Sequence, residues 1–330
     1  HLNRIRCTIR TPETFPTPLA GSIMQGRRII DWLVYLAVRV FLCTLQTLQM
    51  PTCHRVARWL AWLATDVLHV RREVIDGNLR NIYPAMESHQ RQDLARAMWE
   101  HLFLMICEIA HAPRKIHRTN WRQFFSMHQN REMMEFFLDA RPTIVVSGHF
   151  GNFEMAGFVA GLLGFPSYTI IRPLDNQYLN EYVNRFRSMH GQYILEKQGS
   201  SIQAETVLQK GGMLALLGDQ HAGPRGCWVE FLGRPASCHK ALAVFSLAMD
   251  APLLVCYARR ASQPMQFEVG LVAASDPLVH HDRCQSVRTL TMWYNAMLET
   301  AIRRNPEQYW WVHRRWKGKP PARWTGTRAA

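Results

Sequence analysis

A histidine and a glutamate five positions apart are the residues best placed to do chemistry in this sequence. They lie in residues 147–157, Ser-Gly-His-Phe-Gly-Asn-Phe-Glu-Met-Ala-Gly, as His149 and Glu154. A carboxylate that holds one imidazole nitrogen fixes the tautomer, leaves the other nitrogen free as a general base, and stabilises the imidazolium once it forms. Such a pair activates a hydroxyl group. An ordinary surface histidine followed by a helix-initiating glutamate has the same spacing, so the spacing alone does not show that the two residues are catalytic.

The elements around this segment determine whether the two side chains can meet. Thr143–Ser147 is a short apolar run with β-branched residues, which is typical of a buried parallel strand. The apolar stretch Met155–Leu163 follows as a helix. Open α/β sheets bind their ligands at the carboxyl ends of strands. We therefore expect His149 at a strand end, with Glu154 folded back onto its ring from the first turn of the helix.

Strands and helices alternate over the rest of the chain. Further strands are expected at Tyr168–Ile171, Met213–Leu217, Leu253–Tyr257 and Phe267–Val272. Helical patterns are found at His54–His69, Gln90–His111, Asn130–Asp139, Gln177–His190, Ile202–Gln209, Lys240–Met249 and Gln285–Arg304, with Asn78–Pro84 separating the first two. This alternation predicts an α/β fold with a mostly parallel central sheet flanked by helices.

The N-terminal region divides into a lead and an apolar segment. Residues 1–26 are expected to be a disordered lead, and Met24 is a candidate for the true start. Residues 27–50, with the apolar run Ile29–Met50, are expected to be a membrane-anchoring helix, and residues 51–330 the catalytic domain. Arg39 near the middle of the run would cost about 2.5–3.5 kcal/mol in a spanning helix. A spanning helix and an interfacial amphipathic helix therefore both stay open.

The net charge of +14 is concentrated at the two ends of the chain. Residues 1–72 and 301–330 carry the whole positive excess, whereas residues 73–300 carry equal numbers of basic and acidic side chains. Basic ends suit an anionic partner such as phospholipid head groups, a phosphorylated glycolipid, an acidic carrier protein or a nucleic acid. Solvated charge without a partner is the other explanation.

The C-terminal tail mixes aromatic and basic side chains. It contains Tyr309, Trp310, Trp311, Arg314, Arg315, Trp316 and Lys317. Such a mixture can stack on nucleic-acid bases or sit at a membrane interface. Beside an apolar N-terminal segment and a neutral central body, we favour a membrane and an anionic lipid, with Arg314 and Arg315 as lipid-binding residues. A basic nucleic-acid-binding protein is the alternative from a different class.

The sequence lacks the motifs of several other enzyme classes. The sequence has no G-x-S-x-G elbow, no P-loop, no G-x-G-x-x-G after a strand and no H-E-x-x-H. No metal and no bound cofactor are therefore expected. A hydrolase in which water replaces the acceptor hydroxyl stays open. The eight cysteines are scattered without a C-x-x-C pair, which favours a reducing compartment and a cytoplasmic catalytic face.

Several blocks together resemble one family, the late acyltransferases of lipid A biosynthesis (lauroyl and myristoyl transferases), within the glycerolipid and lysophospholipid acyltransferase superfamily. The His-x4-Glu box after a strand is similar to that superfamily's motif. The other blocks are Val74–Pro84 with a following helix that carries Glu108, Arg172–Asn176, Gly218–Gly226, Val229–Gly233 and Pro306–Lys317. The resemblance runs in order from about Arg27 to Lys319.

The resemblance implies a reaction and its partners. A fatty acyl chain would pass from an acyl carrier protein thioester to a hydroxyl of a phosphorylated glucosamine lipid, at the cytoplasmic side of the bacterial inner membrane. His149 would be the general base and Glu154 its orienting carboxylate. The implied substrate-binding residues are Arg172 and Asn176 for phosphate or the oxyanion, together with Arg225 in the block Gly218–Gly226. Asp219 and Gln220, just after a strand, are placed either to bind the sugar or to support the catalytic residues, and ordinary turn residues are the other explanation.

One departure concerns the acceptor. Between the histidine and the glutamate stand Phe150, Gly151, Asn152 and Phe153, whereas the family commonly has other residues there. Gly151-Asn152 resembles a related branch that acylates mannosylated phosphatidylinositol. That glycolipid is therefore the alternative acceptor.

Overall fold

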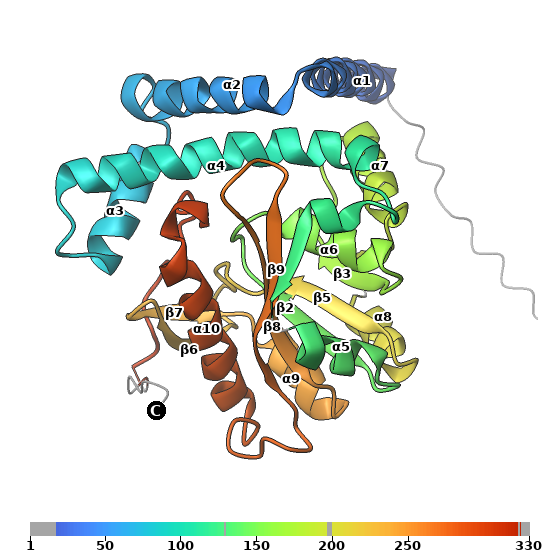
Figure 1. Ribbon diagram of the computed structural model, residues 1–330, viewed down its shortest axis with the longest axis vertical. Helices are drawn as coiled ribbons and strands as arrows, with labels where there is room; N and C mark the ends of the chain where they lie inside the picture. The colour runs from blue at the N-terminus through green and yellow to red at the C-terminus, as the bar shows by residue number, and fades with distance from the viewer. Residues whose placement is uncertain (1–17, 129, 197–199, 323, 325–330) are drawn as a thin grey trace, which may run out of the picture.

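A seven-stranded sheet forms the centre of the molecule, and it is strongly twisted (Figure 1). The computed structural model describes residues 18–128, 130–196, 200–322 and 324. The strands lie in the order β1-β9-β8-β2-β5-β3-β4. Their bounds are β1 Phe125–His128, β2 Thr143–Ser147, β3 Ser167–Ile171, β4 Gln192–Glu196, β5 Met213–Leu217, β8 Leu253–Arg260 and β9 Phe267–Ser275. All neighbours are parallel except β8 and β9, which are antiparallel. The expected fold class is confirmed.

Helices cover both faces of the sheet. The helices of the catalytic domain are α3 Arg72–Ile82, α4 Ser88–Lys115, α5 Asn130–Leu138, α6 Phe153–Leu162, α7 Gln177–Ser188, α8 Ser200–Gln209, α9 Ala241–Ala248 and α10 Val287–Arg304. Helix α10 packs on the face that contains Ile144, Val146 and Val255. The opposite face, with Leu254 and Cys256, packs against α5. The apolar residues of β2 and β8 are buried from both sides, which explains their unbroken hydrophobic runs.

Several elements differ from the sequence-based expectation. The segment Asn78–Pro84 does not separate two helices, because most of it belongs to α3, whose Ile75, Leu79 and Ile82 form one buried stripe. The short edge strands β1 and β4 were not expected. Nor was the hairpin of β6 (Cys227–Phe231) and β7 (Arg234–Cys238). Its two-residue turn, Leu232-Gly233, has positive φ at both positions, as tight hairpins require.

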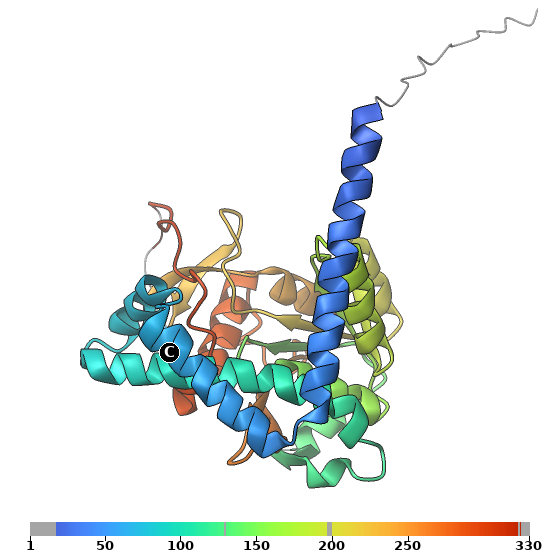
Figure 2. The same ribbon diagram turned by 90° about the horizontal axis from the view of Figure 1, so that it is seen from above.

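The N-terminal helices form a separate layer above the domain (Figures 1 and 2). Helix α1 runs from Pro18 to Thr47 and α2 from Met50 to Trp62, followed by the π-helical turn Leu63–Val67. The expected anchor, residues 27–50, is thus split between two helices. The expected lead is described only from Pro18 on, where α1 has begun, and residues 1–17 lie outside the described part. Within α1, the 20 residues Arg28–Thr47 are long and apolar enough to cross a membrane.

Candidate active site

The imidazole of His149 is held by a carboxylate from a neighbouring strand. Strands β2 and β5 are paired in register, with Ser147 beside Leu217, so the residues two positions further on, His149 and Asp219, emerge together at the carboxyl edge of the sheet. His149 Nδ1 donates to Asp219 Oδ1 at 2.8 Å, and the His149 backbone N–H donates to Oδ2 at 2.9 Å. Both oxygens of Asp219 therefore fix one residue.

Asp219 stays ionised although its side chain is only 1% exposed. Burial alone raises the pKa of this carboxyl group, but the charge of His149 and its two hydrogen bonds outweigh burial and lower the pKa to about 2. An ionised Asp219 accepts the Nδ1 proton, which fixes the tautomer of His149. The lone pair then lies on Nε2, where a general base needs it.

The Nε2 atom of His149 faces an amide and a second histidine. Gln220 Nε2 lies 3.1 Å from His149 Nε2 and 3.2 Å from His313 Nε2, so one amide nitrogen can donate to both rings. Burial, followed by the nearby His149, lowers the pKa of His313 to about 4. His313 is therefore neutral near pH 7 and can accept this bond. Trp310 and Phe153 complete the surroundings, with ring centroids 5.1 and 5.2 Å from His149.

Glu154 has a different partner from the expected one. It lies in the first turn of α6, as expected, but its carboxylate accepts from Arg187 of α7 through both Nε, at 3.1 Å, and Nη2. Both ring nitrogens of His149 are occupied by Asp219 and Gln220, so the predicted contact between Glu154 and His149 is wrong. The helix directs Glu154 towards α7, whereas the end of β5 brings Asp219 directly under the ring. Sequence spacing could not reveal that neighbour.

The remaining predicted residues divide into exposed and structural ones. Arg172 follows β3, is exposed, and pairs with Asp175 at 3.3 Å. Arg225 and Arg314 are exposed as well. Asn176 is occupied: its side chain caps α7 by accepting from the Leu179 N–H at 3.1 Å, and it donates to the Asp31 carbonyl at 2.8 Å.

Arg315 is not available for a substrate. Its side chain is 1% exposed, donates to the Ser237 carbonyl at 2.9 Å, and lies over the ring of Phe231 at 4.8 Å. Tyr309 and Trp311 are likewise buried, at 2% and 1%. The expected lipid-facing role of the tail is therefore wrong for these three residues. Trp311 and Arg315 can be buried because their nitrogen atoms find backbone acceptors, the Pro306 carbonyl at 2.7 Å and the Ser237 carbonyl.

A cavity of about 610 Å³ opens beside His149. Polar residues of its lining include His149, Glu154, Arg172, Arg187 and Gln220. Its apolar lining includes Met133, Met134, Phe137, Val145, Val159, Phe165, Met213, Ala215, Cys256 and Val269. The cavity follows the sheet face under α5 and α6 from the strand ends that carry His149. An apolar chamber with a polar rim suits a ligand that has a long hydrocarbon part and a polar reacting group.

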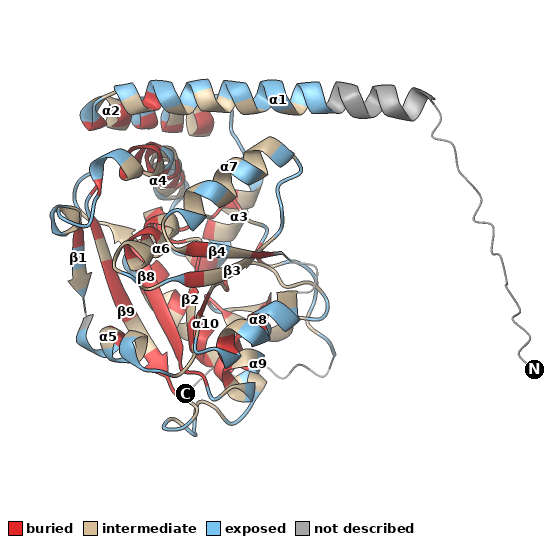
Figure 3. Ribbon diagram, turned by 90° about the vertical axis from the view of Figure 1, so that its right-hand side faces the viewer, coloured by how far each residue is buried: buried red, intermediate tan, exposed pale blue. Residues whose placement is uncertain are grey.

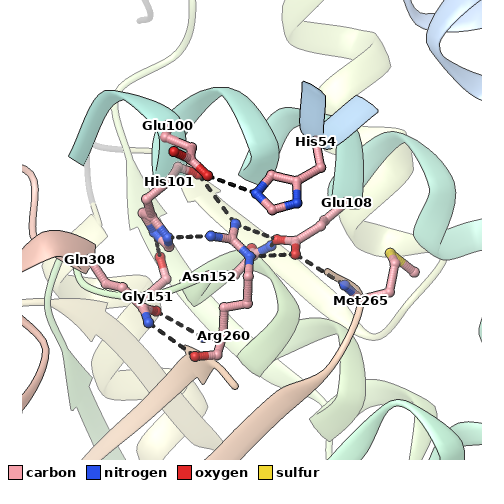
Figure 4. Close-up of polar contacts among 9 residues, drawn as sticks. All are labelled: His54, Glu100, His101, Glu108, Gly151, Asn152, Arg260, Met265 and Gln308. Carbon is pink, nitrogen blue, oxygen red and sulfur yellow. Dashed lines mark hydrogen bonds and ion pairs between the residues drawn. The ribbon is translucent and has the colours of Figure 1, made fainter. Parts of the chain in front are cut away.

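A buried polar network supports the loop behind His149 (Figure 4). Its centre is Glu108 of α4, whose side chain is 0% exposed. Glu108 accepts from Arg260 through Nε at 2.6 Å and Nη2 at 2.8 Å, from Asn152 Nδ2 at 3.0 Å, and from the Met265 backbone N–H at 3.1 Å. This carboxylate thus joins α4, the loop after β2, and both β8 and the segment that follows it.

His101 and Gln308 extend the network to the loop backbone. Arg260 Nη1 donates to His101 Nδ1 at 2.8 Å, so the other ring nitrogen, Nε2, donates to the Gly151 carbonyl at 3.1 Å. Burial and then the charge of Arg260 lower the pKa of His101 to about 3, which keeps this ring neutral. The Gln308 carbonyl accepts from the Gly151 N–H at 2.9 Å. Both polar groups of the Gly151 backbone are therefore satisfied.

Gly151 is required by its surroundings. Its φ is +61°, and a Cβ atom there would lie 2.0 Å from the Ala258 carbonyl oxygen. The next residue, Asn152, donates its backbone N–H to the same oxygen at 2.7 Å. The loop is thus pressed against β8, where a side chain would not fit.

The C-terminal tail closes the loop from the other side. Phe150 and Tyr309 form an isolated antiparallel bridge, and the Trp310 N–H donates to the His149 carbonyl at 3.1 Å. Sequence analysis did not identify Asn152, His101, Arg260 or Gln308 as site residues. A signal was present for Glu108, Asn152 and Gln308, which lie in three of the recognised blocks.

Comparison with known proteins agrees with these blocks. The family described as bacterial lipid A biosynthesis acyltransferase matches residues 22–318. The chain is 24% identical over 297 residues to the lipid A biosynthesis lauroyltransferase of Escherichia coli K12, covering 88% of this chain and 92% of that protein. It is 23% identical over 295 residues to the palmitoleoyltransferase of the same organism, with the same coverage.

Among solved structures, the 1-acyl-sn-glycerophosphate acyltransferase PlsC of Thermotoga maritima is similar. The sequences are 11% identical, the match covers 80% of this chain and 100% of that one, and the TM-score is 0.39.

Proposed function

Because the chain belongs to the bacterial lipid A biosynthesis acyltransferase family, we propose that it moves a fatty acyl chain from an acyl carrier protein thioester to a hydroxyl of a phosphorylated glucosamine lipid. The observation that carries this proposal is His149, oriented by the ionised Asp219 at the rim of a large apolar cavity. Family membership establishes an acyltransferase of lipid A biosynthesis. The donor, the acceptor hydroxyl and the residue roles belong to the proposal.

In the proposed reaction His149 acts as general base. Its Nε2 takes the proton of the acceptor hydroxyl, and the oxygen attacks the thioester carbonyl. The C–S bond breaks as the new ester forms, and the thiolate leaves with the proton that Nε2 returns. Asp219 is a positioning residue, because it acts through His149: its carboxylate holds the ring and stabilises the imidazolium between the two proton transfers.

Gln220 occupies the place that the acceptor hydroxyl must take. Its amide donates to His149 Nε2 in the structure. When a hydroxyl binds there, the amide keeps His313 as an acceptor and has one N–H left for the oxygen of the tetrahedral intermediate. The role of Gln220 in substrate binding therefore follows from the same geometry as the role of His149.

The charged residues at and near the cavity are assigned to the phosphate, the carrier protein and the lipid head groups. We assign Arg172 to an acceptor phosphate, because it is exposed and its partner Asp175 is equally exposed, so the pair can open to take a phosphate. Glu154 positions Arg187 at the lining of the same cavity. Arg225 and Arg314 are exposed cations outside that lining and suit the acidic carrier protein or anionic head groups. The apolar lining takes the acyl chain.

The two residues that suggested mannosylated phosphatidylinositol as the acceptor have structural roles instead. Gly151 and Asn152 suggested mannosylated phosphatidylinositol, but Gly151 is needed for its positive φ and Asn152 is fully buried against Glu108. Gly151 has no side chain, and the buried side chain of Asn152 does not reach a substrate. A phosphorylated glucosamine lipid, consistent with the family, is therefore the acceptor that we propose, at the cytoplasmic face of the inner membrane.

The test is a transfer assay with detergent-solubilised protein, a panel of acyl carrier protein thioesters and a lipid A precursor. We expect the precursor to gain the mass of one acyl chain, and His149→Ala to abolish this gain. Thioester loss without transfer, still dependent on His149, would support the site but contradict the acceptor. Folded protein that leaves every thioester intact would contradict the proposed donor and base.

A further inference from the structure

One face of α1 is attached to the catalytic domain over most of its apolar length. Asp31, Tyr35 and Arg39 lie four residues apart and so share this face. The Asp31 carbonyl accepts from Asn176 at 2.8 Å. The rings of Tyr35 and Tyr182 of α7 have centroids 6.3 Å apart, and the Arg39 guanidinium lies 4.7 Å from the centre of the same Tyr182 ring. The charge of Arg39 is therefore directed at α7 and away from the open side.

The C-terminal part of α1 is attached to α4. Leu42 and Leu45 pack in the core cluster that α4 shares with α6. Gln46 Nε2 donates to the Ala110 carbonyl of α4 at 2.8 Å. Contacts with the domain thus begin at Asp31 and continue to Gln46, inside the 20-residue stretch Arg28–Thr47 that could cross a membrane by length.

These contacts are incompatible with a membrane-spanning α1. If Arg28–Thr47 crossed the bilayer, α7 would be carried to the depth of the lipid tails together with α1. Helix α7 exposes Glu181 and Arg185, and the segment before it exposes Arg172 and Asp175. Charged groups and irregular backbone are not tolerated in contact with lipid tails. The attachment to α7 therefore requires α1 to lie along the membrane and not through it.

The opposite face of α1 is apolar and continues into α2. On α1 it exposes Trp32, Leu33, Val40 and Phe41, and on α2 it exposes Trp59 and Trp62. Figure 3 shows exposed residues along the open side of both helices, which together form the top layer of the molecule. Tryptophan is favoured at the boundary between lipid tails and head groups. This apolar face has the composition of a surface that inserts into one leaflet.

Basic side chains accompany the apolar face. Arg28 of α1, Arg55 and Arg58 of α2, and Arg71 and Arg72 at the start of α3 are all exposed. Exposed acidic residues are sparse here: among described side chains from Arg28 to Arg72, Asp31 and Asp66 are both half-buried, and Asp66 is paired with Arg96. A cationic, tryptophan-containing surface is complementary to anionic phospholipid.

We propose that α1 and α2 lie together in the plane of an anionic phospholipid bilayer, with their shared apolar face in one leaflet. The N-terminus and the catalytic domain are then on the same side of the membrane. The inference rests on the proposed function only in placing the enzyme at a membrane. The membrane-facing surface and the cavity are then connected through α7, because α1 packs on α7 and α7 also carries Arg187 of the cavity lining.

Membrane topology is the measurement that tests the proposal. The full chain, with one epitope before residue 1 and another after residue 330, is placed in sealed membrane vesicles, and protease is added outside. In-plane helices predict that both epitopes are cut together in cytoplasmic-side-out vesicles and both are protected in vesicles of the opposite orientation. Protection of one epitope while the other is cut would overturn the proposal.

A binding assay gives an independent result. Flotation with vesicles of phosphatidylglycerol and phosphatidylethanolamine is compared for Phe41→Glu, Trp59→Glu and the matched control Leu278→Glu, which changes an exposed leucine in the segment after β9, at the far end of the molecule (Figure 1). We expect the first two to lower the bound fraction at least about tenfold, with the control unchanged. Equal binding by all three would contradict the proposal. Neither readout uses catalysis, so a failure here is distinct from a failure of the proposed reaction.

Discussion

Two buried carboxylates flank the loop that carries His149, and they have opposite kinds of partner. Asp219 holds the imidazole of His149, which lines the cavity and whose charge can change during a reaction. Glu108 lies behind the loop and holds the guanidinium of Arg260, which is always charged. The first pair can follow a proton through a catalytic cycle. The charges of Glu108 and Arg260 stay constant, so the loop keeps its position while His149 gains and loses a proton.

The largest effect is expected from the pair at the cavity. Asp219→Asn keeps the shape but removes the charge that stabilises the imidazolium, so we expect kcat to fall by about 10²–10⁴-fold. Glu154→Gln, which loses its charge pairing with Arg187 but leaves the His149 contacts intact, is expected to lose about tenfold or less. Single-turnover acyl transfer measures both. A larger loss in Glu154→Gln than in Asp219→Asn would reverse the assignment of the positioning carboxylate.

The pair behind the loop is expected to affect stability. Glu108→Gln leaves the guanidinium of Arg260 buried without its counter-charge, which typically costs about 3–5 kcal/mol of unfolding free energy. The double variant Glu108→Gln/Arg260→Met removes both charges and should lose less than the sum of the single variants. Chemical denaturation in detergent measures all three. Additive losses would show that the two residues act independently.

His101 gives this region a pH dependence. Its folded pKa of about 3 lies below the usual 6.5, so between these values the unfolded chain binds a proton that the folded one does not. Stability should therefore be fully retained above pH 6.5 and fall as the pH is lowered, by about 1.4 kcal/mol per unit for this one group. Comparing wild type with His101→Gln between pH 6.5 and 5 isolates the contribution. Identical slopes would contradict a neutral, buried His101.

The smallest effect is expected where the C-terminal tail meets β8. The Gln308 side chain accepts from the Arg260 backbone N–H at 2.8 Å and donates to the Arg260 carbonyl at 3.0 Å. Gln308→Ala removes two hydrogen bonds, each with a net contribution of about 1 kcal/mol. We expect a loss of about 2 kcal/mol in denaturation and a modest fall in kcat. No loss of stability would mean that the tail is held by its other contacts alone.

The sequence predicted the local elements of the site better than their partners. The run Thr143–Ser147 and the helix after it were predictable, because burial and periodicity are local properties. The neighbour of β2 was not, because β5 lies beside it only after two intervening strands have been placed further out. Asp219 was therefore identified as a site residue but not as the partner of His149.

The C-terminal tail shows a second limit of prediction from sequence. Tyrosine and tryptophan, as at Tyr309 and Trp311, are common both at membrane interfaces and in protein cores. Only the packed structure shows which of the two environments these residues occupy. Arg315 was misassigned for the same reason, since its buried acceptors, such as the Ser237 carbonyl, belong to a hairpin that was not predicted. For Arg39 the sequence was informative: a charge in the middle of the apolar run already argued against a spanning helix, and the structure adds its partner, the Tyr182 ring of α7.

The bridge between Phe150 and Tyr309 sets an order of events during synthesis. A ribosome makes α1 and α2 first, then His149, and makes the segment that holds the His149 backbone only after strands β3 to β9 and α10. A growing chain can therefore settle on the membrane long before its active site exists. The proposed site is complete only when Tyr309 and Trp310 have left the ribosome and folded back onto Phe150 and His149, by which time α1 and α2 can already lie at the proposed membrane surface.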